Sequence, residues 1–460
     1  MSLDAVLLSR IQFFWVIALH ILLPAFTVGL ASYIAVLEGL YLVTRREAYL
    51  RLSAFWLKVF AVSFGMGVVS GIVMPFQFGT NWSRFSDMTA DVLGSPMAYE
   101  VLTAFFLEAG FLGILLFGRA RVPTWVHFFA SLMVAGGTLL SSFWILSANS
   151  WMQTPTGYSV VDGRFFPADW FAVIFNPSFP YRLVHTVTAF YITTALVVAG
   201  VAAYHLRAGR FREEGLVMLK QALGLLTILV PLQIYIGDRH GLNTLEYQPA
   251  KLAAIEANWE TQKRMPLLLF AVPDERAEDN RFEIGIPEAG SLILRHDVDG
   301  VVPGLKDFPR DDRPPVAIPF FAFRAMVGIG LVVLALVVAS WWVWWRGALA
   351  EARGFLKLCE LASPLGFAAV IAGWITTEVG RQPWVVYGLM RTRDAVTPSL
   401  GGSDVLASLL VYMLVYLLVF GSGLYFLVRL VRRGPAPERV GEETPQGRPA
   451  RPLSAVSERT

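Results

Sequence analysis

The stretch GFAAVIAGWITTEVGRQPW, residues 366–384, decides the fold class of this chain. It begins as an apolar run long enough to lie in a membrane, and it ends with two ionisable residues, Glu378 and Arg381, around a Gly-Arg-Gln-Pro turn. Ionisable groups at membrane depth are costly, so they usually have a partner or a function. The stretch therefore predicts a membrane-spanning helix that carries a functional carboxylate near one end.

The composition extends this prediction to the whole chain. Of its 460 residues, 55% are hydrophobic and only 16% are charged, whereas soluble domains contain about 25% charged residues. The formal net charge of +3 is nearly balanced, and we expect no nucleic-acid partner. The single cysteine, Cys359, excludes an internal disulfide framework and a thiolate metal cluster within the chain. This composition is typical of a polytopic membrane protein.

Apolar runs of about 20 residues, the length needed to cross a bilayer, recur along the chain. We predict spans at residues 13–42, 53–76, 97–118, 125–148, 183–206, 216–236, 318–345, 356–379 and 404–430. The N-terminal segment lacks the cationic region and cleavage site of a removed signal peptide, so we expect its helix to be retained. The predicted fold is an all-α integral membrane protein with about nine transmembrane helices.

The charges of the connectors predict the orientation. Clusters of arginine follow the first, third, fifth, seventh and ninth spans, and the positive-inside rule makes that side cytoplasmic. The N-terminus is then outside and the C-terminus cytoplasmic. We expect four regions: transmembrane helices 1–6 (residues 1–236), an outer-face loop (237–316), helices 7–9 (317–430) and a disordered cytoplasmic tail (431–460). A loop of this length is usually functional or disordered, and its segment PAKLAAIEANWETQ predicts a short helix.

Two histidines, His20 and His185, lie inside predicted spans, where an imidazole has few partners and a cofactor or relay role is as plausible as simple packing. His127 and His205 lie at predicted cytoplasmic helix ends, where a cation near a helix terminus or interface is the ordinary explanation. His240 and His296 lie in the outer loop, where ordinary solvation explains them.

Met326 lies early in the seventh span, and a methionine in a helix is ordinarily apolar packing. A His/Met pair is nevertheless an axial ligand set for a low-spin electron-transfer haem. The predicted topology places His185, Met326 and Glu378 near the outer face, with His20 in the outer half of its span. We therefore expect four ligand-type residues in one layer.

A second pattern, MAYEVLTAFFLEAGF, carries Glu100 and Glu108 a little over two helical turns apart, on one helix face. Two carboxylates along a membrane helix suit a proton relay or counter-charges for a cofactor. The ordinary alternative is a pair of salt bridges to neighbouring arginines. Together with Glu378, these carboxylates also fit a proton- or ion-coupled transporter.

Six motifs together resemble subunit I of the bd-type quinol:oxygen oxidases, in family order from residue 9 to about residue 384. They are SRIQFFWVIALH, NWS with AYEVLTAFFLE, RLVHT, KLAAIEANWETQ, FRAMVG and GWITTEVGRQPW. Each motif alone is a weak signal, but the ordered set is specific. The outer loop is short, as in the short-loop branch of that family, which includes cyanide-insensitive members.

The resemblance implies a haem site. It implies His185 and Met326 as the axial ligands of a low-spin haem b, with Arg324 close to that haem. It implies His20 and Glu378 as ligands of two high-spin haems, one a haem b and the other a haem d or a further haem b.

It further implies a set of residues around the high-spin pair and at the quinol site. Glu100 and Glu108 would lie near the pair, with Glu108 delivering protons. The other residues implied beside the haems are Trp374, Arg381 and Trp384. Lys251 and Glu256 would serve quinol oxidation in the outer loop, with Glu256 as the base that accepts a quinol proton.

The implied activity is that of an electrogenic terminal oxidase of the bacterial cytoplasmic (inner) membrane. Ubiquinol or menaquinol would be oxidised at the outer face, and dioxygen reduced to water with cytoplasmic protons, without pumping. The implied partners are a homologous second membrane subunit (subunit II) and, in some relatives, a small single-span subunit. Two alternatives are the transporter above and a haem b quinol dehydrogenase that passes its electrons elsewhere.

Overall fold

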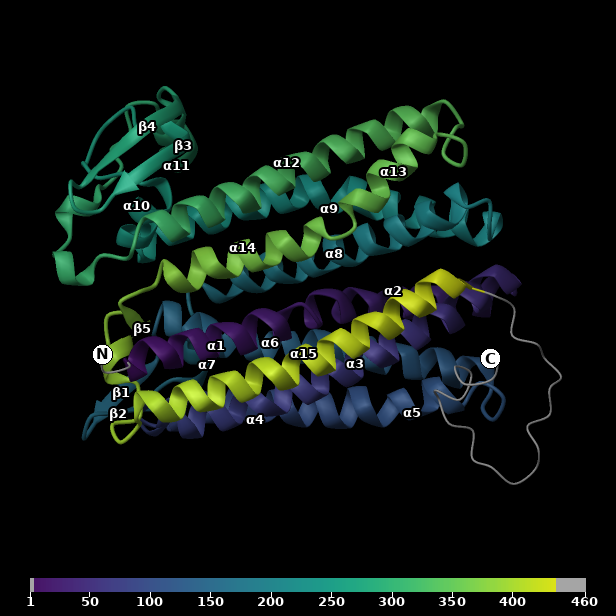
Figure 1. Cartoon of the computed structure of the whole chain (residues 1–460), viewed down its shortest axis with the longest axis horizontal. Helices are drawn as coiled ribbons and strands as arrows, with labels where there is room; N and C mark the ends of the chain where they lie inside the picture. The colour runs from purple at the N-terminus through teal and green to yellow at the C-terminus, as the bar shows by residue number, and fades with distance from the viewer. Residues whose placement is uncertain (1–3, 436–460) are drawn as a thin grey trace.

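The computed structural model describes residues 4–435. Within this range, nine helical segments are long and apolar enough to cross a membrane, which confirms the predicted fold class. Figure 1 shows them running roughly along one direction in a single elongated bundle. The predicted orientation across the membrane stays a prediction. The end of the predicted tail, residues 436–460, lies outside the described residues.

The spans are built from helices that are often interrupted. The long helices are α1 (Ala5–Ile21), α2 (Pro24–Thr44), α3 (Glu47–Thr80), α4 (Ser83–Thr103), α6 (Thr124–Gln153), α8 (Phe179–Arg207), α9 (Arg212–Tyr247), α12 (Ala317–Trp345), α14 (Leu365–Val379) and α15 (Gly402–Arg433). The shorter ones are a π-helix (Ala104–Ala109), α5 (Gly110–Phe117), α7 (Trp170–Ile174), α10 (Pro249–Glu256), α11 (Ala289–Arg295) and α13 (Arg353–Ala362).

Three small antiparallel strand pairs lie in the connectors, and the sequence analysis did not predict them. They are β1 (Tyr158–Val161) with β2 (Arg164–Pro167), β3 (Leu267–Asp274) with β4 (Asp279–Ile286), and β5 (Trp384–Val386) with β6 (Met390–Arg391). The β3–β4 hairpin belongs to the long loop, which Figure 1 shows at the end of the bundle where α12 begins.

Helix α8 is the centre of the bundle. Among the nine spans found in the described residues, the span that contains α8 is the most deeply buried: 72% of its most apolar stretch is buried inside the protein. It packs against α2, α6, α9, α13 and α14. Small residues allow this close approach: a Cβ at Gly366 of α14 would lie 2.6 Å from Thr193 Cα, and one at Gly200 would lie 2.7 Å from Ser363 Cβ.

The first span is broken directly after His20. Pro24 begins α2, and because proline has no N–H it cannot donate to the carbonyl of His20 four residues earlier. The Leu23 N–H donates to that carbonyl instead, at 3.0 Å. The break ends α1 one residue beyond His20, and this places the imidazole at a helix end inside the bundle.

The sixth span is longer than predicted. Helix α9 continues to Tyr247, although the outer loop was expected to begin at residue 237. The polar residues that follow Gly237 remain helical because α10 and α11 of the loop pack against this extension. The loop proper therefore begins at Gln248.

A buried polar cluster joins α2, α3 and α6 near the end of the bundle opposite the long loop. Glu38 is fully buried, and its carboxylate accepts hydrogen bonds from Arg119 at 2.5 and 3.0 Å and from the Ser53 hydroxyl. It also lies 3.1 Å from His127 Nδ1, while His127 Nε2 donates to the Leu115 carbonyl. The cluster satisfies an otherwise unpaired buried charge, which would be costly alone.

We predict that Gly366→Ala destabilises the protein by about 1–3 kcal/mol, because the new methyl group would overpack the contact with Thr193. The matched control is Gly224→Ala in α9, where no atom lies within 4 Å of the added Cβ. There the better helix propensity of alanine should be neutral or stabilise by up to ~1 kcal/mol. Thermal unfolding of the purified protein checks both variants, and equal shifts would contradict the prediction.

Candidate functional site

One large cavity lies inside the bundle and extends into the long loop. It has a volume of roughly 1390 Å³ and a mainly apolar lining. Ligand pockets usually range from about 300 to 1,000 Å³, so this cavity has room for more than one large group. Its lining includes ten of the twelve predicted site residues: His20, Glu100, Glu108, His185, Lys251, Glu256, Met326, Trp374, Glu378 and Arg381.

His185 and Met326 lie on the cavity wall near the end of the bundle that carries the loop. His185 Nδ1 is buried without a hydrogen-bond partner in the described part of the chain. Its ring faces His240 of α9 at 5.4 Å between centroids. The Met326 sulfur lies against Gly373 of α14. A Cβ added at residue 373 would lie only 2.8 Å from that sulfur. His185 therefore offers a buried nitrogen without a partner, and Met326 a thioether sulfur on the same cavity wall.

His20 has one ring nitrogen fixed and one available. Its Nδ1 lies 2.9 Å from Ser70 Oγ, and that hydroxyl donates to the Met66 carbonyl of its own helix at 3.0 Å. Since the hydroxyl proton is used there, Nδ1 carries the proton of the shared bond and Nε2 keeps a free lone pair. A histidine held in this way by a hydrogen bond is typical of metal ligands. His20 is the 16th residue of its 40-residue span, Ala5–Thr44. The four residues line one cavity, and their common layer stays a prediction.

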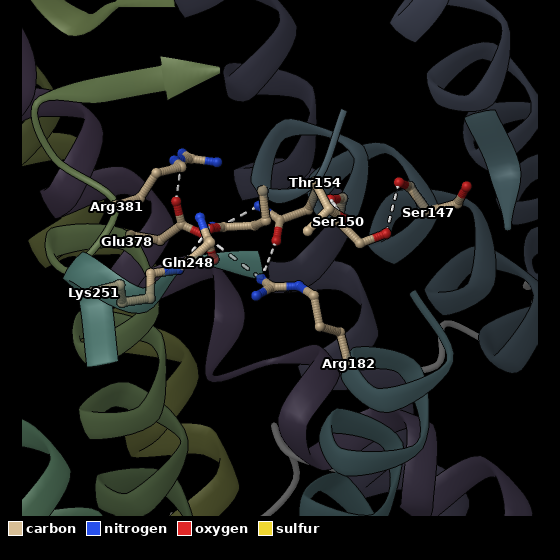
Figure 2. Close-up of polar contacts among 10 residues, drawn as sticks. Ser147, Ser150, Thr154, Arg182, Gln248, Lys251, Glu378 and Arg381 are labelled. Atoms are coloured by element: carbon tan, nitrogen blue, oxygen red, sulfur yellow. Dashed lines mark hydrogen bonds and ion pairs between the residues drawn. The ribbon is translucent and has the colours of Figure 1, made fainter. Parts of the chain in front are cut away.

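Glu378 lies at the end of α14 within a dense polar cluster (Figure 2). Its Oε2 accepts a hydrogen bond from Arg381 Nη2 at 2.5 Å. Its Oε1 accepts from Asn149 and Gln153 of α6 at 3.2 and 3.3 Å. Arg182 of α8 stands 3.8 Å from the same oxygen. Four side chains from three segments of the chain thus converge on this carboxylate.

Lys251 of α10 joins the same cluster and not the outer surface. It is buried, and its Nζ donates to Gln153 Oε1 at 2.6 Å and to Gln248 Oε1 at 2.7 Å. Burial lowers the pKa of Lys251 well below its ordinary value, and the nearby charge of Arg182 adds to this effect. The cluster around Glu378 therefore extends into the loop.

This cluster has a surplus of positive charge. Arg182 and Arg381 supply two cationic groups, whereas Glu378 supplies one carboxylate. Arg182 Nε and two nitrogens of Arg381, Nε and Nη1, are buried without a partner among the described residues. Buried cations are normally paired, so the cluster is suited to bind an anionic group.

Glu100 and Glu108 both face α6, and the π-helix between α4 and α5 contains Glu108. The Ser141 hydroxyl donates to Glu100 Oε1 at 2.9 Å. Gly137 lies one turn before Ser141 on α6 and makes room for the Glu108 side chain. A Cβ added at residue 137 would lie 2.8 Å from Glu108 Cγ. Glu108 Oε1 is buried without a partner in the described region. Neither carboxylate forms an ion pair there, so the salt-bridge alternative is wrong for both.

Glu256 lies in a separate cluster from Lys251, although both line the cavity. Arg324 Nη2 binds Glu256 Oε2 at 2.7 Å and also donates to the Leu268 carbonyl of β3 at 2.8 Å. Arg324 therefore ties α12 to the loop, and it is not part of the cavity lining. The structure brings Glu256 together with Arg324 and not with Lys251.

The two predicted tryptophans occupy different surroundings. Trp374 lines the cavity and packs against Phe14 of α1, with 5.4 Å between ring centroids. Trp384 lies in β5 outside the cavity lining, with the Arg391 guanidinium 4.6 Å above its ring. Only Trp374 is in a position to contact a group inside the cavity.

Comparison with known proteins identifies the family. A model of the family described as cytochrome bd terminal oxidase subunit I matches residues 8–435. The chain belongs to this family. It is thus a subunit of a membrane-bound terminal oxidase. The bacterial relatives and the nine apolar helices found within residues 4–435 place it in the inner membrane as a multi-pass protein.

The cytochrome bd relatives match along nearly their whole length. The chain is 34% identical over 446 residues to cytochrome bd ubiquinol oxidase subunit 1 of Bacillus subtilis, covering 94% of each protein. It is 32% identical to cytochrome bd-II ubiquinol oxidase subunit 1 of Escherichia coli, covering 96% of this chain and 99% of that one. A chain in the bd oxidase structure from Geobacillus thermodenitrificans superposes with a TM-score of 0.86 at 31% identity, over 94% of this chain and 99% of that one.

Sequence reasoning missed several polar residues of this cytochrome bd subunit. His240 was interpreted as a solvated loop histidine, which is wrong, because it lies on α9 and lines the cavity. Arg182 was quoted in a motif but not singled out, although it precedes His185 by three residues and so shares its helix face. Asn149 and Gln153 have an i, i+4 spacing that could have indicated a polar face. Gln248 offered no such signal.

We predict that Arg381→Ala destabilises the protein by about 3–5 kcal/mol, because it leaves the Glu378 carboxylate buried without its closest cation. The matched control is Arg393→Ala, an exposed arginine 3.8 Å from Asp394, where the loss should stay below ~1 kcal/mol. Thermal unfolding of the purified complex measures both. A similar loss of stability in the two variants would contradict the assigned role of Arg381.

Proposed function

We propose that this chain is the haem-bearing subunit of a quinol:oxygen oxidase, with its haems in the cavity described above. One observation carries the proposal: a single large cavity collects His20, His185, Met326 and Glu378. In the described residues no group of three or more His, Cys, Asp or Glu side chains forms a conventional metal site. The ligand-type residues are instead spread around a cavity, as bulky iron-porphyrin groups require.

The side chains fit haem chemically. His185, with its unpartnered Nδ1, and Met326 would hold a low-spin haem b. His20 and Glu378 would each hold a high-spin haem, one haem b and one haem d or further haem b, at which dioxygen would be reduced. Two propionate carboxylates per haem would suit the surplus cations Arg182 and Arg381. When bound, the haems carry electrons and reduce dioxygen.

The quinol end of the site lies where the cavity enters the loop. Glu256 is a buried carboxylate on the cavity wall, where Arg324 holds it in place through an ion pair. A positioned carboxylate can act as a general base. We assign Glu256 as the base in the oxidation of ubiquinol or menaquinol. Lys251 orients Gln153 and Gln248, and through Gln153 it supports Glu378.

Protons for dioxygen reduction are assigned to the carboxylates of the third span. Glu108 has an unpartnered buried oxygen and lines the cavity, so it can hold a proton and release it there. Glu100 lines the cavity in the same helical segment, with its carboxylate oriented by Ser141. Uptake from the cytoplasm and release of quinol protons outside would separate charge without pumping.

The chain is proposed to work with a homologous second membrane subunit, as the designation subunit I implies. Large apolar side chains remain exposed on several spans, including α12 and α15. A second subunit, a small single-span subunit and lipid would share these surfaces. The transporter alternative has no observation in its favour beyond the membrane carboxylates.

A reduced-minus-oxidised visible spectrum of the purified complex tests the proposal directly. We expect low-spin haem bands in the parent protein and their loss in Met326→Leu, since leucine has no atom to bind iron. Met74→Leu, another cavity-lining methionine, is the control and should keep the bands. A complex without haem bands would overturn the proposed function, whereas an unchanged low-spin signal in Met326→Leu would overturn only that ligand assignment.

We also predict that Glu108→Gln lowers quinol-dependent oxygen uptake by about 10²–10⁴-fold, because glutamine cannot transfer a proton. Asp404→Asn, an exposed carboxylate at the start of α15, should have no effect. Oxygen-electrode rates normalised to haem content separate proton delivery from loss of cofactor. Unaltered turnover in Glu108→Gln would exclude Glu108 from the proton route.

A further inference from the structure

The β3–β4 hairpin of the long loop exposes an apolar surface that the proposed oxidase chemistry does not use. We define this hairpin surface as Leu269, Phe270, Phe282, Ile284 and Ile286, all of which are exposed. Phe282 is 78% exposed and Ile284 61% exposed. Contiguous apolar side chains of this size on a soluble loop mark a surface that contacts protein or membrane.

The strand register directs these side chains outward. Phe270 pairs with Ile284, whereas Val272 pairs with Arg281, so β4 contains one extra residue in the segment with Phe282 and Glu283. A second irregularity, between Leu268 and Phe270, leaves Leu269 as an extra residue on β3. Bulges of this kind redirect side chains. Both bulges lead to exposed, large apolar residues.

The backbone at Phe282 is unusual. Its φ is +55°, in the left-handed region that bulky side chains rarely adopt. Such a conformation is unfavourable and usually persists at positions with a function. In this hairpin, the residue with the positive φ is also highly exposed, so the Phe282 ring points away from the hairpin.

The hairpin surface is continuous with an exposed side of α12. The opposite side of the hairpin is anchored, since Leu268 and Ala271 share a core with Phe320 at the start of that helix. Phe270 lies against Phe321, with 6.0 Å between ring centroids. Phe321 begins a row of exposed residues that continues along one face of the span: Ala325, Gly328, Val332 and Ala335.

The lining of the central cavity also extends toward this hairpin. It includes Ile293 of α11 and Ile318 of α12. Figure 1 shows the hairpin at the margin of the bundle, beside the beginning of α12 and not over the bundle centre. An apolar surface at that margin is where the bilayer surface would meet the protein.

We propose that the hairpin surface is seated in the lipid headgroup and upper acyl region next to α12. The occupant is the lipid of the bilayer, since the surface continues an exposed side of a membrane span through the contact of Phe270 with Phe321. Its aromatic and aliphatic residues are those that anchor interfacial segments. The hairpin thus forms a lipid-seated edge beside the beginning of α12. This seating does not depend on the proposed function.

Site-directed labelling of the complete complex tests the seating. The native Cys359 is buried, so Phe282→Cys introduces an accessible thiol for an environment-sensitive fluorophore. The complex is reconstituted in vesicles of phosphatidylcholine and phosphatidylglycerol, with nitroxide groups on the acyl chains of some lipids. Interfacial apolar groups lie about 5–10 Å into the boundary region, so we expect strong quenching by the nitroxide lipid and little by aqueous iodide.

Lys263→Cys, an exposed polar position of the same loop, is the matched control and should show the reverse pattern. The parent complex, treated in parallel, measures label bound elsewhere. Ile284→Cys provides a second position in case the first variant folds poorly. Quenching of positions 282 and 284 by iodide would overturn the proposal. Shielding from both quenchers would also overturn it, by showing that a protein covers the surface.

Discussion

The ion pair between Glu378 and Arg381 is the interaction on which the rest of this site depends. Burying a carboxylate in a membrane protein is costly unless cations and hydrogen bonds surround it. Here α6 supplies amides, α8 supplies Arg182, and Lys251 of α10 donates a hydrogen bond to Gln153. Because α10 belongs to the long loop, the same cluster also fixes the loop on the bundle. Figure 2 shows this convergence.

Departures from regular helix give the cavity its lining. Pro24 ends the first helical segment just beyond His20. The third span changes to a π-helix at the segment that contains Glu108, and such segments often occur at functional sites. The eighth span is divided at Ser363, where Gly200 of α8 allows close packing. Regular helices would bury these positions against their neighbours, whereas the breaks leave side chains facing a common space.

Much of the architecture could be predicted because the signals are local. Length and apolarity alone indicate a membrane span, so nine spans were predicted from the chain and confirmed in the described residues. The ordered motifs predicted ten residues that the cavity lining contains. The hairpin pairs, the extension of α9 and the position of His240 were not predicted. They depend on contacts between the loop and the bundle, which leave no periodic pattern in the sequence.

The sequence by itself determined the membrane-embedded class, the order of the helices and the kinds of ligand-type residues, because hydrophobicity and side-chain chemistry are properties of short segments. Only the tertiary structure decided which of those residues meet. It joined Lys251 to the cluster of Glu378 and Glu256 to Arg324, although both lie on one short helix. The physical reason is that buried charges take whichever partner the packing of distant segments brings within hydrogen-bonding distance.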